Sequence, residues 1–115
     1  MESILTSSKR LIGGIPEEED HFDPEIITYI NSVFATLRQM GVGPAEGFRI
    51  EGEDATWDEF TEGNTRLEFV RDYMASKVKL KFDPPDRTVI MEALKSNIAE
   101  LEFRLHVAAD ESESY

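Results

Sequence analysis

The sequence predicts a mainly α fold, a small helical domain of about four helices. Apolar residues recur at three- and four-residue spacing through most of the chain, which is typical of amphipathic helices. Glycine or proline stands where one such stretch gives way to the next. The 115 residues are 40% hydrophobic, enough for one core of ordinary size, so wholesale disorder is not expected.

The first two helices are predicted from their ends. Residues 3–12 are amphipathic and are followed by Gly13-Gly14, where a helix would stop. After an acidic linker at 17–20, Asp23-Pro24-Glu25 favours a new helix, because Asp can cap free amide groups and Pro fits the first turn. Its apolar stripe ends before Gly41 and consists of Ile26, Ile30, Val33, Phe34 and Leu37.

A loop-rich insertion, 41–63, is predicted between the second and third helices, because glycines and a proline interrupt any regular pattern there. Phe48 and Ile50 alternate with polar residues, as in a short strand. Residues 56–59, Thr-Trp-Asp-Glu, have the spacing of a capping box that opens a brief helical turn. We expect Trp57 and Phe60 to hold this loop against the core.

Residues 64–82 and 86–107 are predicted to form a long antiparallel helix pair, joined by a tight turn at Asp83-Pro84-Pro85. Asn64 and Asp86 are expected to cap the two helices. The second of them carries an apolar seam at four- and three-residue steps, made of Ile90, Leu94, Ile98, Leu101 and Leu105. Residues 1–109 are predicted to form a single domain. Residues 110–115 are an acidic tail, flexible unless a partner binds it.

Composition narrows the function classes. The absence of cysteine excludes disulfides, thiolate metal sites and a cysteine nucleophile. A formal net charge of -12 opposes binding to phosphate backbones, so sequence-specific DNA binding is not expected. The charge suits solubility, docking to a basic partner, or the lining of a passage through which DNA slides. No apolar run at the N-terminus predicts a signal peptide or a membrane span.

Few residues have the chemistry of an active site. His21 lies in a loop without a companion motif, and His106 follows Glu102 by four residues, which predicts a surface pair more readily than half a metal site. The carboxylates of residues 51–59 lack the spacing of a calcium-binding loop. We interpret the lysines of residues 77–81 as helix-end stabilisation. We therefore expect no catalytic residue, no metal, no cofactor and no enzymatic activity.

The chain resembles the head-tail connector, or head-completion adaptor, proteins of tailed bacteriophages. The motifs that carry the resemblance are His21 to Ile27, Ile30 to Phe34, Gly41-Val42-Gly43-Pro44, Ala55-Thr56-Trp57, Lys77 to Leu80, Phe82-Asp83-Pro84-Pro85 and Ile98-Ala99-Glu100-Leu101-Glu102. The resemblance implies a structural virion protein, made in the host cytoplasm, whose copies form a ring, typically a dodecamer, beneath the portal protein. Such a ring extends the channel used in genome packaging, lets DNA pass without sequence-specific binding, and receives a tail-side connector or stopper protein. The family has no catalytic residues to carry over.

Ring closure needs a patch on one copy that fits a different patch on the next. Apolar residues beside the main stripes of the long helix pair are candidates for these patches, with ordinary core as the alternative: Phe69, Tyr73, Leu80 and Phe103. The tail is a candidate docking segment through Asp110, Glu111, Glu113 and Tyr115.

Two other functions remain open. An acidic DNA mimic that inhibits a host nucleic-acid-binding enzyme would explain the charge of -12. Ring formation distinguishes a connector from such a mimic. A carboxylate-dependent hydrolase is the third hypothesis, and it would be abandoned if divalent cations neither bind the protein nor stabilise it.

Overall fold

The computed structural model describes residues 2–13, 15–16, 18–62 and 69–113, with the backbone alone for 110–113. Five helices are present in these ranges and no strand is: α1 (Ile4–Ile12), α2 (Asp23–Gln39), α3 (Trp57–Thr61), α4 (Val70–Phe82) and α5 (Thr88–Glu113). The predicted mainly α fold is confirmed. No helix in the described ranges is both long enough and apolar enough to cross a bilayer.

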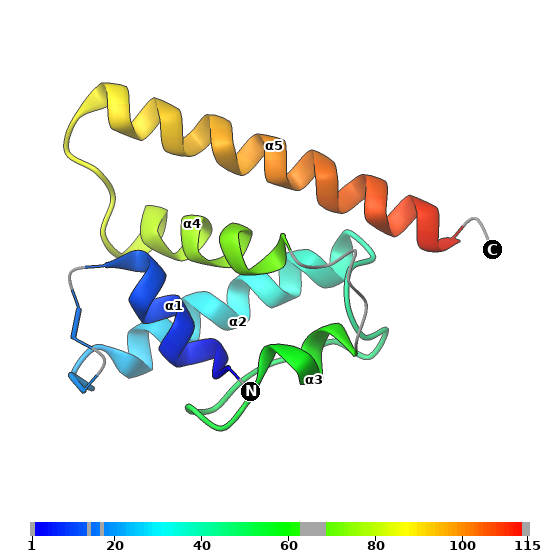
Figure 1. Ribbon diagram of the computed structural model, residues 1–115, viewed down its shortest axis with the longest axis horizontal. Helices are drawn as coiled ribbons and strands as arrows, with labels where there is room; N and C mark the ends of the chain where they lie inside the picture. Colours follow the sequence, from blue (N-terminus) through cyan, green and yellow to red (C-terminus); the bar gives the residue numbers. More distant parts are fainter. Residues whose placement is uncertain (1, 14, 17, 63–68, 114–115) are drawn as a thin grey trace.

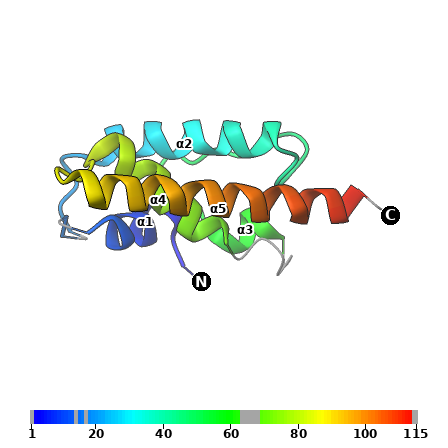
Figure 2. The same ribbon diagram turned by 90° about the horizontal axis from the view of Figure 1, so that it is seen from above.

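Helix α4 lies in the middle of the fold (Figure 1). Helix α5 packs along one side of α4, and α1 and α2 pack against it from the other. The view from above shows α5 crossing over α4, with α1 and α2 on either side (Figure 2). The buried residues of α4 cover a wide arc of the helix, as this central position requires: Val70, Tyr73, Met74, Ala75 and Val78.

Helix α1 begins and ends as its local sequence predicts. The Ser3 side chain caps it by accepting from the Thr6 amide at 3.2 Å. Gly13 follows its last residue with φ 79°, and its amide donates to the carbonyl of Lys9. A left-handed conformation of this kind favours glycine, which explains why the helix stops there.

The start of α2 was predicted correctly, but the role of Asp23 as its cap was wrong. Phe22 is the N-cap residue and makes no side-chain cap hydrogen bond. Asp23 instead forms an ion pair with Lys9, whose Nζ atom lies 2.9 Å from Oδ1 of Asp23. Only 3% of the Lys9 side chain is exposed, and an unpaired ammonium group buried to this degree is costly. The Asp23 carboxylate therefore pairs with the buried ammonium group of Lys9 and does not cap the backbone amides of α2.

The connection between α2 and α3 contains no strand at Phe48 and Ile50, so that prediction was wrong. Both backbone groups of Ile50 bind the Asn31 side chain: Nδ2 donates to its carbonyl at 2.9 Å, and its amide donates to Oδ1 at 2.7 Å. A side chain of α2 thus satisfies the backbone that a neighbouring strand would have paired. An isolated antiparallel bridge joins Ser3 and Thr56 farther along the chain.

The predicted helical turn in this connection is confirmed as α3. Thr56 and Glu59 form the capping box, each side chain accepting from the other residue's backbone amide. Trp57 and Phe60 are each 2% exposed, and Nε1 of Trp57 donates to Oγ of Ser7 at 2.7 Å. These two aromatic residues hold the connection against the core, as expected.

Helices α4 and α5 form the predicted antiparallel pair around the Pro84-Pro85 turn. The predicted cap Asn64 and the first residues of the predicted third helix lie outside the described residues, and α4 begins after Phe69. Helix α5 begins at Thr88, two residues later than predicted from Asp86. It continues past the predicted end near 107, because no glycine or proline interrupts 108–113 and Ala108 and Ala109 are buried.

Candidate assembly surfaces

The inner face of α5 is buried only toward its C-terminal end. Ile98, Leu101 and Leu105 are at most 7% exposed, and Leu94 is half-buried. Ile90 was predicted to continue this seam, but 48% of it is exposed. The first turns of α5 diverge from α4 (Figure 1), in agreement with this exposure.

The outer face of α5 carries a second apolar row, which we call the outer stripe: Val89, Ala93, Phe103 and Val107. Successive helical residues are rotated by about 100°, so these four positions fall on one side of the helix, opposite the buried seam. Val89 is 80% exposed, Phe103 68% and Val107 39%, and Ala93 is also exposed. Ser96 and Glu100 lie on the same side between Ala93 and Phe103, so the stripe consists of two short apolar pairs, each a candidate contact with another protein.

Of the four predicted apolar contact residues, only Phe103 lies on this stripe. Phe69 and Leu80 are half-buried and pack against the core, and the Arg104 guanidinium lies 5.0 Å from the centroid of the Phe69 ring. Tyr73 is 0% exposed and offers no surface to a partner. Its position in the central helix explains this correction, because its ring fills space between the packed helices.

The Tyr73 hydroxyl fastens α4 to α5. It donates to Oε2 of Glu102 at 2.8 Å, and Nζ of Lys77 lies 4.0 Å from the same oxygen. Burial, and then the hydrogen bond and negative charge of Glu102, raise the pKa of Tyr73 well above its usual 10.0. The predicted surface pair of Glu102 with His106 was therefore wrong, because Glu102 is turned toward α4.

The predicted tail residues stay a prediction. Asp110, Glu111 and Glu113 lie on the helical backbone of α5, and the structure describes nothing of their side chains. Tyr115 lies outside the described residues. Helix α5 therefore continues from the predicted domain into the first residues of the predicted acidic tail.

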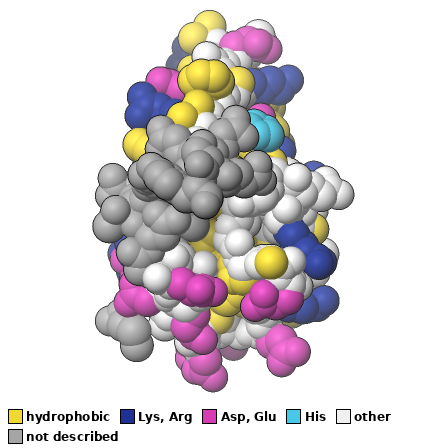
Figure 3. All heavy atoms as spheres, turned by 90° about the vertical axis from the view of Figure 1, so that its right-hand side faces the viewer, with side chains coloured by type: hydrophobic (Ala, Val, Ile, Leu, Met, Phe, Trp, Pro, Cys, Tyr) yellow, Lys and Arg dark blue, Asp and Glu magenta, His cyan; other side chains and the backbone are white. Residues whose placement is uncertain are grey.

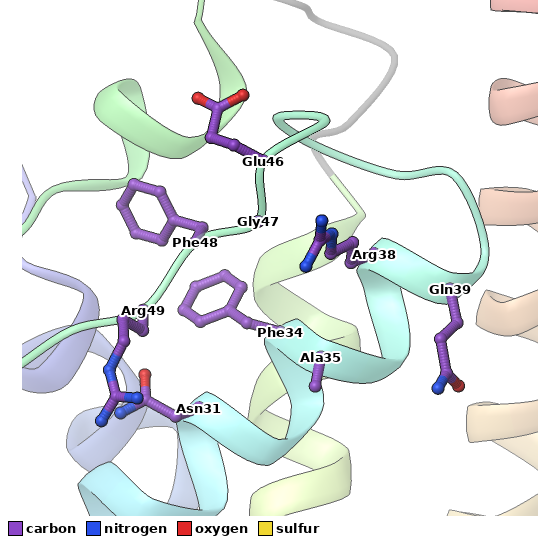
Figure 4. Close-up of a pocket in the computed structure, with 9 residues that line it drawn as sticks. All are labelled: Asn31, Phe34, Ala35, Arg38, Gln39, Glu46, Gly47, Phe48 and Arg49. Atoms are coloured by element: carbon purple, nitrogen blue, oxygen red, sulfur yellow. The ribbon is translucent and has the colours of Figure 1, made fainter.

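A groove that the sequence did not predict lies between α2 and residues 46–49 (Figure 4). Its volume is about 650 Å³, and it is lined by Asn31, Phe34, Ala35, Arg38, Gln39, Glu46, Gly47, Phe48 and Arg49. The two phenylalanine rings pack edge to face with centroids 5.1 Å apart. The guanidinium groups of Arg38 and Arg49 stand on either side of the Phe34 ring (Figure 4).

The two arginines of the groove have no carboxylate partner among the described residues. Nε of Arg38 donates to the carbonyl of Ala45 at 3.1 Å, and Arg49 has no ion pair in this part of the chain. Gly47 has φ 92°, and a Cβ atom there would lie 3.2 Å from Cδ of Arg38. Glycine therefore lets the connection turn back close to α2 and brings the two arginines to one groove.

Charge is unevenly distributed over the surface. Figure 3 shows most of the acidic side chains of this face at its lower end, whereas hydrophobic, basic and a few acidic side chains are mixed at the upper end, where α5 lies. The exposed carboxylates of α3 and its flanking loops are Glu51, Glu53, Asp54, Asp58, Glu59 and Glu62. The described residues contain no group of three or more His, Asp or Glu side chains placed to hold a metal ion.

The comparisons with known proteins point to one family. A family model described as phage connector protein matches residues 4–112, nearly the whole chain. No curated protein and no solved structure matches it. A match of this extent, on a helical chain with an exposed apolar stripe, shows that the protein belongs to the phage connector protein family.

Proposed function

We propose that this chain is a non-enzymatic structural subunit of the head-tail connector of a tailed phage, and that its copies assemble into a closed ring beneath the portal protein. The observation that carries the proposal is the match of residues 4–112 to phage connector proteins. In this proposal the ring extends the DNA channel at the head-tail interface and receives a tail-side connector or stopper protein. A dodecamer is the stoichiometry we expect.

The outer stripe of α5 supports self-assembly. A ring needs two different patches that fit each other on neighbouring copies, and the stripe supplies one apolar patch that the chain itself leaves uncovered. The net charge of -12 supports the channel, because acidic side chains facing the passage would repel phosphates and let DNA slide.

Ring formation is tested by measuring mass with light scattering and by imaging particles, for the protein alone and with portal protein. We expect a discrete oligomer and annular particles. Phe103→Glu places a charge on the outer stripe and is expected to shift the mass toward the monomer. Thr28→Glu adds the same charge on the exposed side of α2 and serves as the matched control. A chain that stays monomeric with portal protein and is absent from purified virions would contradict the proposal.

A second candidate function, an acidic DNA mimic, is favoured by the carboxylates gathered around α3. A mimic would keep a small mass and bind a host nucleic-acid-binding enzyme in a manner that weakens with salt. The same mass measurement therefore distinguishes the two functions.

A further inference from the structure

We propose that the groove between α2 and residues 46–49 receives the acidic segment 110–115 of a neighbouring copy. This inference rests on the proposed assembly of several copies, and it names one contact that would join them. The groove supplies the positive charge and the apolar surface, and the segment supplies the carboxylates and one aromatic ring.

Two arginines give the groove its positive charge. The chain has 24 acidic residues and 12 basic ones, yet Arg38 and Arg49 have no carboxylate partner among the described residues. The Glu46 carboxylate points away from the phenylalanine rings (Figure 4). Guanidinium groups bind carboxylates through two parallel hydrogen bonds, and they also stack on aromatic rings. The groove is thus suited to an acidic segment that contains an aromatic residue.

Segment 110–115 has this chemistry. Its sequence, Asp-Glu-Ser-Glu-Ser-Tyr, holds three carboxylates and one tyrosine in six residues. Helix α5 carries the start of the segment beyond the other helices, to one extreme of the molecule (Figures 1 and 2). A position at the extreme of one copy is favourable for reaching the next copy.

In two other acidic segments, one glutamate is already engaged in contacts of its own. The Glu19 carbonyl accepts from Nζ of Lys9 at 2.6 Å, and a Glu19 carboxylate oxygen accepts from the amide of His21. Glu59 is occupied by the capping box of α3. The groove volume of about 650 Å³ is in the range of small-molecule ligand pockets, about 300–1,000 Å³.

Peptide binding tests the groove directly. A fluorescent peptide with the sequence of residues 107–115 is titrated into full-length protein whose own tail is neutralised by Asp110→Asn, Glu111→Gln and Glu113→Gln, and anisotropy is measured. We expect saturable binding that weakens with salt. Adding Arg38→Glu and Arg49→Glu should weaken it by about tenfold or more, equivalent to about 1.4 kcal/mol.

Three controls decide the outcome. Arg87→Glu with Lys95→Glu makes the same charge change at exposed positions outside the groove, and it should leave the affinity unchanged. A peptide with amides in place of its carboxylates should not bind. The proposal would be overturned if the groove variant and the control variant lost binding to the same extent. It would also be overturned if a short DNA oligonucleotide bound through Arg38 and Arg49 where the peptide did not.

Docking between copies is separated from docking within one chain by mixing two proteins. One carries the neutralised tail and an intact groove, and the other carries Arg38→Glu, Arg49→Glu and an intact tail. Cross-links from the second tail to the first groove are expected. The proposal would be overturned if the mixture gave no such cross-links while the unmodified protein gave cross-links between the tail and the groove of the same chain. If the peptide fails to bind while rings form, tail docking alone is wrong; if the peptide binds and rings never form, the proposed function is wrong.

Discussion

The inner and outer faces of α5 both carry apolar residues at helical spacing, but they differ in burial. On the inner face, Ile98, Leu101 and Leu105 recur at three- and four-residue spacing and are buried against the rest of the chain. On the outer face, Val89, Phe103 and Val107 follow the same helical repeat and are exposed. The difference shows that the fold buries one apolar face of this helix and leaves the second exposed.

The same contrast appears along the helix. Toward its C-terminal end, α5 is fixed to α4 by apolar packing and by the hydrogen bond from Tyr73 to Glu102. Toward its N-terminal end, Val89 and Ile90 are 80% and 48% exposed. Substitutions on the inner face should therefore change the stability of the single chain, whereas those on the outer stripe should change its association.

The largest expected effect is that of Leu105→Ala on the inner face. Leu105 is 0% exposed, so its truncation leaves a cavity between α5 and the core. The free energy of unfolding should fall by about 2–5 kcal/mol, measured by urea denaturation. A fall below about 0.5 kcal/mol would mean that α5 is not packed on the core in solution.

Tyr73→Phe should have an intermediate effect. It keeps the ring and removes the hydroxyl that donates to Glu102, so we expect a loss of about 1–2 kcal/mol in the free energy of unfolding. Thermal and urea denaturation at neutral pH measure it. Glu102→Gln keeps an oxygen that can accept and provides the matched control, with a smaller loss.

The pH dependence of stability tests the same hydrogen bond between Tyr73 and Glu102. The pKa of Tyr73 is raised in the folded protein above its usual 10.0, so the unfolded chain loses this proton first as pH rises. The stabilisation from the neutral hydroxyl is fully present below pH 10 and is lost as pH rises from 10 toward the folded pKa. Tyr73→Phe should show a shallower alkaline decline than the parent protein, and identical declines would contradict this assignment.

The smallest effect on stability is expected for Phe103→Ala, two residues from Leu105 on the opposite face. Because Phe103 is 68% exposed, the free energy of unfolding of the monomer should change by no more than about 0.5 kcal/mol. Association should nevertheless weaken, seen by light scattering as a lower mass at equal protein concentration. Unfolding like that of Leu105→Ala would show that the outer stripe belongs to the core.

Much of the fold could be predicted because its signals are local. The Ser3 cap and Gly13 bound α1, the Thr56 capping box starts α3, and the prolines at 84 and 85 separate α4 from α5. Each signal acts within a few residues, through hydrogen bonds or backbone sterics that do not depend on the rest of the chain. The apolar repeats likewise placed the core in the long helices.

The candidate surfaces could be predicted only in part. Phe103 was identified from its place beside the main stripe, and a second helical repeat at 89, 93, 103 and 107 was available in the sequence to extend it. Tyr73 also lies beside the main stripe, so its sequence position does not distinguish a surface residue from a core residue. It is buried because α4 is packed on both sides by other helices. The arginine groove had no sequence signal, since Arg38 and Arg49 are brought together by the turn around Gly47.

Caps, glycines and prolines set the ends of α1, the start of α3 and the turn between α4 and α5, because they act on their immediate neighbours. Tertiary structure decided which groups meet: Lys9 draws Asp23 away from a cap, and Asn31 replaces a strand partner for Ile50. It also decided which face of α5 is covered. These outcomes depend on burial and on partners distant in the chain, and a polar group that loses water must bind whichever partner the fold brings to it.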